Sequence, residues 1–292
     1  MAEKHGSTLI NSDNGSLAFK IFSFQDNSPF DHLQRHNYST IILITEGEGE
    51  LKAEVSQYPI RKPSMIFLSP YQPYMIIGKG VIAGVALQFH TDFFCTLKFD
   101  KEVSCRGILF DNIYEPPLIN LEKNQVEIFL SLIDQMKVEL KTTNFAQQQL
   151  LVSLLRIFII NASRIRMSHK SKAEETFSNN SEPFILQNLK DAIEKHYRTK
   201  RSASEYGPIL NISAKSLARI CKTHFNKTIT DLIAERVIIE AKRELYLTDK
   251  PVKSIAHELG FNDEYYFSRF FKTNTDVSPK AFRDSVGFAR GE

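Results

Sequence analysis

The chain has few cysteines and no long apolar run, and each shortage excludes a class of protein. Its three cysteines, Cys95, Cys105 and Cys221, include no CxxC pair, so neither a disulfide framework nor a zinc site is expected. The longest apolar stretch, residues 150–160, is interrupted by Ser153 and is shorter than the about 18 residues that a transmembrane helix needs. We therefore expect a protein that does not cross a membrane.

A secretion signal and catalytic signatures are missing as well. Glu3, Lys4, His5 and Ser7 stand where a signal peptide would be apolar, which predicts a cytoplasmic location. The sequence contains neither a GxSxG elbow, nor a P-loop, nor a GxGxxG fingerprint, and Cys95 lacks the sequence context of a nucleophile. The sequence therefore predicts neither an enzyme nor a cofactor.

The composition is that of a folded protein with two domains. Charged residues make up 24% and hydrophobic residues 42% of the 292 residues, and this length predicts roughly two domains. The net charge of +3 is too small to indicate a partner, but the residues from Glu182 onward carry 19 Lys and Arg against 15 Asp and Glu. A mildly basic second half indicates where a polyanion would bind.

A polar stretch, residues 168–182, marks the domain boundary. Its sequence, SHKSKAEETFSNNSE, lacks periodicity and ends before Pro183, which is typical of an exposed linker. We therefore predict a first domain over residues 1–167, a linker over residues 168–182 and a second domain over residues 183–292.

The first domain begins with short strand-like segments. They are rich in aromatic and branched residues and cover Leu17–Phe24, Tyr38–Thr45, Glu50–Val55, Met65–Leu68 and Val81–Phe89. The glycine-containing segment Glu46–Gly49 predicts a hairpin loop between two of these strands. Turns at such close spacing predict an antiparallel barrel or sandwich.

Two amphipathic helices follow the strands. Their apolar residues recur at helical spacing and are Val126, Phe129, Leu130, Ile133 and Leu140 in the first helix and Leu151, Leu154, Leu155 and Phe158 in the second. Such stripes must be buried against the strands, against a second copy of the chain, or both. We favour a contribution to a homodimer, with purely intramolecular packing as the alternative.

The second domain contains an internal repeat, in which residues 210–222 align with residues 259–272. In the second copy a short helix ends at Gly260, which supplies the left-handed residue of a turn, and Asn262 or Asp263 caps the next helix. The inner face of that helix is predicted to consist of Phe267, Phe270 and Phe271. Helix, turn and capped helix form a helix-turn-helix, whose second helix can enter the major groove of DNA.

The first copy repeats this arrangement with Asn211 at the turn, since Asn tolerates the left-handed region, and with Ser213 as the cap. The residues predicted to face inward are Leu217 and Ile220. Pro208 in the preceding helix lacks a backbone donor and is expected to bend or shorten it. Between the copies, Thr230–Leu247 predicts a single helix that can hold two recognition helices about one DNA turn, roughly 34 Å, apart.

These features resemble the tandem helix-turn-helix domain of the AraC/XylS family of bacterial transcription regulators over roughly residues 184–288. The most specific stretch, residues 255–283, matches the family pattern of IA…GF, YFSR.FK and SP..(F/Y)R. The pattern of the linker helix is matched by Arg236, Glu240, Ala241 and Leu245. Departures from the family are Asp276, where glycine is usual, and Asn211 and Pro208 in the first copy.

The resemblance implies double-stranded promoter DNA as a partner and activation by contact with RNA polymerase. The DNA-binding residues it implies are Lys215, Ser216, Arg219 and Lys222 in the first copy and Glu264, Tyr265, Arg269 and Lys272 in the second. Arginine can bind guanine bidentately and glutamate can accept from cytosine, whereas the lysines are expected at phosphates. For Arg219 and Arg269 the alternative is an intradomain salt bridge or a phosphate contact.

The first domain is similar to the cupin-like effector-binding and dimerisation domain of the same family. The similarity rests on His36–Tyr38 before a strand, on the EGEGEL segment and on residues 60–70, where Ser64 replaces a frequent glycine. A barrel of this size can hold one small ligand. The effector-binding candidates are Phe22, Phe24, Tyr38, Tyr74 and Phe89, and the alternative is that these aromatic residues are plain core.

Metal-dependent catalysis in such a barrel is not expected. A metal site there needs a cluster such as HxH with a later Glu and His, whereas His32, His36 and His90 are sparse and differently spaced. We interpret these histidines as surface or core residues, so no metal is predicted.

The sequence thus predicts an α+β protein of two domains, with an N-terminal cupin-like antiparallel β-barrel carrying a helical pair and a C-terminal all-α tandem helix-turn-helix domain. The expected function is sequence-specific DNA binding that regulates transcription, controlled by a small-molecule effector through a population shift. The alternative is an effector-free regulator whose barrel is a protein-interaction module. A ligand-sized cavity would favour the first, and a side-chain-filled barrel with an exposed apolar face the second.

Overall fold

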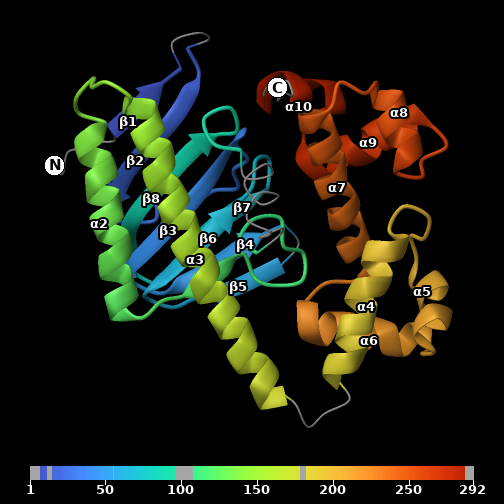
Figure 1. The fold of residues 1–292 in the computed structure, drawn as a ribbon. Helices are drawn as coiled ribbons and strands as arrows, with labels where there is room; N and C mark the ends of the chain where they lie inside the picture. The colour runs from blue at the N-terminus through green and yellow to red at the C-terminus, as the bar shows by residue number, and fades with distance from the viewer. Residues whose placement is uncertain (1–6, 12–14, 55, 96–107, 178–181, 287–292) are drawn as a thin grey trace. The chain divides into compact units, whose positions relative to one another are not determined.

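The chain forms two compact units. The computed structural model describes residues 7–11, 15–54, 56–95, 108–177 and 182–286 (Figure 1). The first unit comprises Met1–Asp111 and Pro116–Ser168, and the second comprises Asn112–Glu115 and His169–Glu292. The predicted domain boundaries stay a prediction. The backbone is helical up to Phe177, however, where the polar composition had suggested an irregular linker.

The first unit contains two antiparallel sheets, as the strand-like segments predicted. The larger sheet has six strands in the order β1 (Ser7–Ile10), β2 (Leu17–Phe24), β8 (Ala83–His90), β3 (Tyr38–Glu46), β6 (Ser64–Leu68) and β9 (Leu118–Asn120). The smaller sheet has three strands in the order β5 (Ser56–Ile60), β4 (Gly49–Ala53) and β7 (Tyr74–Gly78). All pairs of neighbouring strands are antiparallel.

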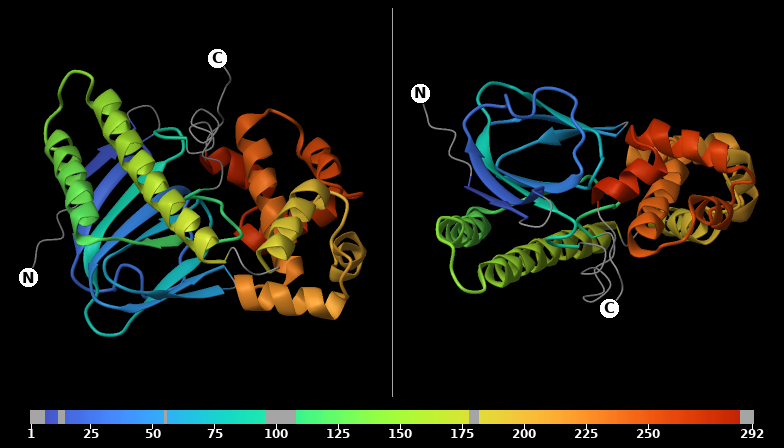
Figure 2. Two further views of the ribbon diagram at one scale, coloured as in Figure 1. Left: turned by 60° about the horizontal axis from the view of Figure 1, so that its bottom comes forward. Right: turned by 90° about the horizontal axis from the view of Figure 1, so that it is seen from above.

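The larger sheet is buried on both faces, and successive residues of β3 show why. Ile42 and Ile44 belong to an apolar cluster shared with the smaller sheet. Ile41 and Leu43, which point to the opposite face because side chains alternate along a strand, belong to a second cluster shared with two helices. The N-terminal unit is therefore layered as small sheet, large sheet and helix pair (Figure 2).

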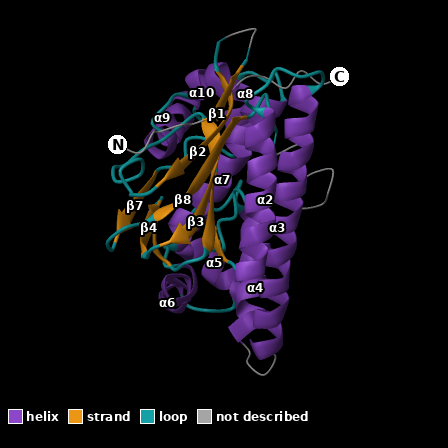
Figure 3. Ribbon diagram, turned by 90° about the vertical axis from the view of Figure 1, so that its left-hand side faces the viewer, coloured by secondary structure: helices purple, strands orange, loops and turns teal. Residues whose placement is uncertain are grey.

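The two helices are α2 (Lys123–Glu139) and α3 (Gln147–Phe177), which lie side by side along the large sheet (Figure 3). The predicted stripes pack against the sheet. Phe129, Ile133, Leu151, Leu155 and Phe158 are fully buried and Leu154 is 7% exposed, while Val126, Leu130 and Leu140 are half-buried against the same cluster. These stripes are thus used within one chain, so any dimer must use another face. None of the helices in the described ranges has both the length and the apolar character needed to cross a membrane.

The predicted hairpin at Glu46–Gly49 is wrong. β3 pairs with β6 and β8, whereas β4 pairs with β5 and β7, so this segment carries the chain from one sheet to the other. Gly47 has a φ of +91°, and a Cβ there would lie 2.1 Å from the carbonyl oxygen of Val81. The glycine is required because the crossing passes directly against another backbone.

The second unit contains the helices of the predicted repeat. In chain order they are α4 (Glu182–His196), α5 (Ala203–Leu210), α6 (Ala214–Phe225), α7 (Ile229–Leu247), α8 (Val252–Glu258), α9 (Glu264–Thr275) and α10 (Pro279–Val286). The predicted helix Thr230–Leu247 is confirmed as α7, and its apolar residues Leu232, Ile233, Val237, Ala241 and Leu245 are at most 1% exposed. Ser278 caps α10, since its hydroxyl accepts from the amide of Ala281 at 3.1 Å.

Candidate nucleic-acid interface

The second helix-turn-helix, α8 and α9, has the local geometry that its sequence predicts. Gly260 has a φ of +80°, and Phe261 then returns to the core with 6% of its surface exposed. Asp263 caps α9, because its carboxylate accepts from the amides of Tyr265 at 3.1 Å and Tyr266 at 2.9 Å. The turn and the start of α9 are therefore fixed by local chemistry.

The first helix-turn-helix, α5 and α6, is built in the same way. Asn211 adopts the left-handed conformation with a φ of 54°, and the hydroxyl of Ser213 accepts from the amide of Ser216 at 3.1 Å. Pro208 lies inside α5, yet α5 has 8 residues and α8 has 7. Pro208 thus does not make α5 shorter than its counterpart α8, and the other expected effect, a bend, stays a prediction.

The helices α6 and α9 also end in the same way. Asn226 follows α6 and Asp276 follows α9, and both adopt the left-handed conformation that closes a helix, with φ of 53° and 65°. Asp276 is therefore the counterpart of Asn226. Because Asp tolerates this conformation better than most residues, it can stand where the family usually has glycine.

The inner faces of α6 and α9 are apolar. Phe267 and Phe271 are fully buried, as predicted, and Phe270 is half-buried with its ring 5.2 Å from that of Phe261. In α6 the fully buried residues are Leu217 and Cys221, while the predicted Ile220 is half-buried. Each helix is thus held against its domain by one side only.

The outer faces carry the residues implied for DNA binding. Those exposed are Lys215, Ser216, Arg219, Lys222, Tyr265, Arg269 and Lys272, whereas Glu264 is half-buried. Among the described residues, neither Arg219 nor Arg269 has a carboxylate within 4 Å, which disfavours the intradomain salt bridge as an alternative. Both guanidinium groups are therefore available to a ligand.

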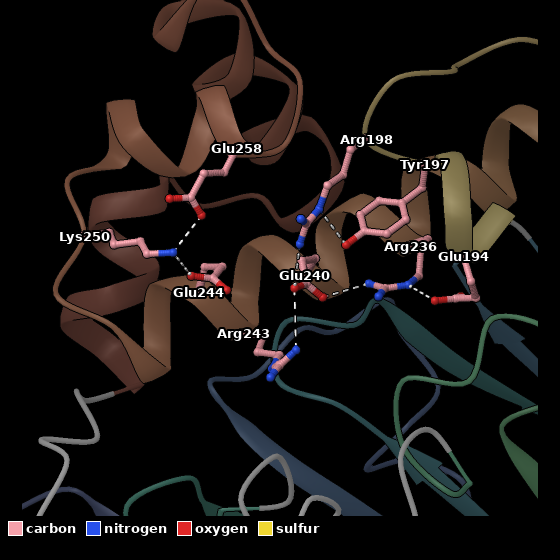
Figure 4. Close-up of polar contacts among 9 residues, drawn as sticks. All are labelled: Glu194, Tyr197, Arg198, Arg236, Glu240, Arg243, Glu244, Lys250 and Glu258. Atoms are coloured by element: carbon pink, nitrogen blue, oxygen red, sulfur yellow. Dashed lines mark hydrogen bonds and ion pairs between the residues drawn. The ribbon is translucent and has the colours of Figure 1, made fainter.

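The helix α7 between the two copies holds a buried carboxylate surrounded by three arginines (Figure 4). Glu240 is 4% exposed, and its oxygens lie 3.3 Å from Arg198, 3.1 Å from Arg236 and 3.5 Å from Arg243. Arg236 also reaches Glu194 of α4 at 2.8 Å. Because a buried charge is costly unless it is paired, this network holds α4 against α7.

A second contact in this unit comes from the first half of the sequence. Residues Asn112–Glu115 belong to the second unit. The Tyr114 hydroxyl donates to the Glu194 carboxylate at 3.0 Å, and its ring lies edge-on to Phe225 with the centroids 6.0 Å apart. Burial, together with the negative charge of Glu194, raises the pKa of Tyr114. Sequence reasoning missed this contact, because it joins positions 80 residues apart.

The aromatic candidates for an effector site divide between the two cores of the first unit. Phe24 and Tyr74 are buried between the sheets, where Phe22 packs against them, while Phe89 belongs to the cluster that faces the helices. Tyr38 is half-buried and stacks on His36 at 4.6 Å. The structure therefore brings Phe22, Phe24 and Tyr74 together, but not Phe89.

The histidines of the first unit have neighbours of their own. His36 lies 2.7 Å from the amide oxygen of Gln34, and His90 lies 3.4 Å from the carboxylate of Asp92. Within the part of the chain that the structure describes, no three His, Cys, Asp or Glu residues gather as a metal-binding group.

Comparison with known proteins agrees with the two helix-turn-helix units. A helix-turn-helix domain family matches residues 208–285. An uncharacterized HTH-type transcriptional regulator in the cgkA 5' region of Pseudoalteromonas carrageenovora is 34% identical over 116 residues, which are 40% of this chain and 67% of that protein. The chain belongs to the AraC/XylS-type helix-turn-helix transcriptional regulators. These proteins are DNA-binding regulators of transcription rather than enzymes.

Other proteins resemble this AraC/XylS-type regulator over shorter or longer parts of its chain. The raffinose operon transcriptional regulatory protein RafR of Pediococcus pentosaceus is 30% identical over 95 residues, and the chain spans only 34% of RafR. A crystal structure of apo ToxT from Vibrio cholerae has 16% identity and a TM-score of 0.42, with 92% of this chain and 98% of that chain covered. A TM-score this low supports no conclusion about a ligand or function of this chain.

Proposed function

We propose that this AraC/XylS-type regulator inserts α6 and α9 into two successive segments of the major groove on one face of a promoter. The observation that carries the proposal is the pair of capped helices, each buried on one side and exposed on a polar side. Between them α7 has 19 residues, which corresponds to about 28 Å. With the flanking helices, this span suits recognition helices roughly 34 Å apart.

Within each helix the residues divide into two roles. The guanidinium groups of Arg219 and Arg269 suit bidentate hydrogen bonds to guanine, and Glu264 suits a hydrogen bond from the cytosine amino group. Lys222 and Lys272, in the last turns of α6 and α9, are expected to contact phosphates, because a flexible point charge positions the protein without specifying sequence.

The test is a comparison of base preference between Arg269→Ala and the wild-type protein. Sites are first selected from a random duplex library with the full-length chain, and affinities are then measured on every single-base variant of the selected site. Arg269→Ala should lose about 1–3 kcal/mol and its preference at one base pair, while Lys280→Ala, which removes an exposed charge from α10, should keep the preference. An equal loss on all sequences would limit Arg269 to phosphate contact.

We further propose that the two sheets close as a cupin-like barrel and bind a small-molecule effector beside Phe22, Tyr38 and Tyr74. Support comes from Phe22 and Tyr38, which are half-buried and so accessible to a ligand, and from Phe30, whose ring lies 6.1 Å from Phe22 and 6.3 Å from Tyr74. The test is the melting temperature with a panel of sugars, carboxylic acids and aromatic compounds. A compound that stabilises the wild type but not Phe22→Ala would support the site, and a panel without effect would favour an effector-free regulator.

The homodimer is proposed through the outer face of α3. Leu150 and Ile157 are each 47% exposed and Met167 is 54% exposed. Leu150, Ile157, the half-buried Ile160 and Met167 follow one another at spacings of seven, three and seven residues. Such spacings place them on one side of the helix, as in a helix that pairs with another helix. Contact with RNA polymerase, which the family resemblance implies, stays a prediction.

Analytical ultracentrifugation tests this interface. Ile157→Glu should shift the full-length protein toward monomer, because the substitution places a charge in the seam. Lys141→Glu changes an exposed residue outside the seam and should leave the sedimentation unchanged. If the wild type is a monomer at micromolar concentration, or if Ile157→Glu remains a dimer, the exposed face of α3 serves another partner.

A further inference from the structure

The two helix-turn-helix units are joined by a second element besides α7. Residues 197–202, which connect α4 to α5, run directly against the turn between α8 and α9. A Cβ at Gly260 would lie 1.8 Å from the carbonyl oxygen of Arg198 and 2.9 Å from its carbonyl carbon. The backbone of the second turn therefore touches the backbone of this connection, and no side chain fits between them.

Arg201 stabilises this contact between residues 197–202 and the turn before α9. Its guanidinium donates to the carbonyl of Leu259 at 2.5 Å and lies 4.6 Å from the centroid of the Phe261 ring. The Leu259 carbonyl is at the C-terminal end of α8, where carbonyl groups lack partners within the helix and favour a positive charge. A planar guanidinium can donate to the carbonyl and cover the ring at once, which a lysine ammonium cannot do.

The same connection is anchored to the first helix-turn-helix. The backbone amides of Arg201 and Ser202 both donate to the carboxylate of Glu205 at 3.0 Å, in the first turn of α5. The Ser202 hydroxyl donates to the same carboxylate at 2.7 Å. The connection is thus part of the N-terminal cap of α5.

The connection is also anchored to the middle of α7. Arg198 lies 3.3 Å from Glu240, and the Tyr197 ring lies 4.3 Å from the guanidinium of Arg236 (Figure 4). Both partners are on α7, four residues apart. Residues 197–202 therefore contact α5, α7 and the turn before α9.

We propose that residues 197–202 act as a bracket that fixes the distance and angle between α6 and α9, and that Arg201 is a positioning residue for the half-site spacing that the protein accepts. This rests on the proposed insertion of α6 and α9 into DNA. With α7 as the only link, bending at its ends would let the two recognition helices adjust to different spacings. A second link in parallel removes that freedom, so one spacing is favoured.

The experiment compares spacing preference in full-length wild type, Arg201→Ala and Arg201→Lys. Duplexes carry the two half-sites of the selected site at the native separation and with one or two base pairs added or removed, and dissociation constants are measured by fluorescence anisotropy. The wild type should lose at least about tenfold in affinity per changed base pair, the scale of one mismatched position. Arg201→Ala should bind the native spacing more weakly and the altered spacings nearly as well as the native one.

Two controls keep the outcomes distinct. Lys195→Ala removes a positive charge from the exposed surface of α4 and should keep the wild-type preference. Arg201→Lys keeps the charge and should show an intermediate preference, which decides the matter if Arg201→Ala fails to fold. If Arg201→Lys and any folded Arg201→Ala discriminate spacing as sharply as the wild type, the bracket does not set the spacing. If Arg219→Ala and Arg269→Ala leave binding unchanged, the proposed function itself is wrong.

Discussion

The ammonium group of Lys227 donates to the backbone carbonyl of Ile113 at 3.3 Å, although the two residues are 114 positions apart in the chain. Lys227 is 6% exposed, and its charge is balanced by the carboxylate of Glu235 at 2.7 Å. It lies in the turn between α6 and α7, directly after the first recognition helix. The hydrogen bond therefore joins the end of α6 to the four-residue segment 112–115, and the ion pair joins it to α7.

Removal of Lys227 is expected to destabilise the second unit. Lys227→Met removes the ammonium group that lies 2.7 Å from the Glu235 carboxylate, whose side chain is only 15% exposed. Breaking a buried pair in this way costs about 3 kcal/mol in the free energy of unfolding. Urea unfolding followed by circular dichroism measures the loss. The double variant Lys227→Met/Glu235→Leu should recover part of it, and a single variant as stable as the wild type would show that the pair contributes little.

Gly260→Ala tests the close approach of the two turns. The new methyl group would meet the carbonyl oxygen of Arg198, in addition to the strain of a φ of +80°. Gly80 is a matched control, because its φ is +93° and nothing lies within 4 Å of its Cβ position. Gly80→Ala should lower the free energy of unfolding by about 1 kcal/mol through backbone strain alone. Gly260→Ala should lower it by clearly more. Equal losses in denaturant unfolding would mean that the backbone at Arg198 yields easily.

The features that sequence predicted here are those with local causes. The Asp263 cap, the left-handed Gly260 and the Ser213 cap each depend on residues within three positions, so the residue type reveals the structure. Strand β7 was not predicted, and the crossing at Glu46–Gly49 was predicted as a hairpin. Both depend on which distant strand pairs with a given strand, and local sequence does not show this.

The same distinction applies to the candidate interface. The outward direction of Arg219 and Arg269 follows from helical periodicity, which is a local property. The contact of Arg201 with Leu259 spans 58 positions and has no periodic or motif signal. Arg236 and Glu240 did carry a signal, since a spacing of four places opposite charges together on a helix.

Salt dependence should separate phosphate contacts from base contacts. Affinity for the selected site should fall steeply with salt, because each neutralised phosphate releases a counterion. Lys222→Ala and Lys272→Ala should each reduce the slope of log affinity against log salt by about 1 and weaken binding to all sequences alike. Anisotropy titrations between about 50 and 200 mM salt measure this slope. A slope that both substitutions leave intact would place these lysines away from the phosphates.

The thiol of Cys221 should resist alkylation in the folded protein. It is fully buried on the inner face of α6, and burial raises its pKa to about 11. A raised pKa means that a smaller fraction of the thiol is in the reactive thiolate form at pH 8. Cys95 is half-buried and serves as the internal comparison. Peptide mapping after iodoacetamide treatment at pH 8 should show Cys95 modified before Cys221, and Cys221 modified only in denaturant or at markedly higher pH. Rapid modification of Cys221 in the native protein would mean that α6 opens from its domain far more often than its packing predicts.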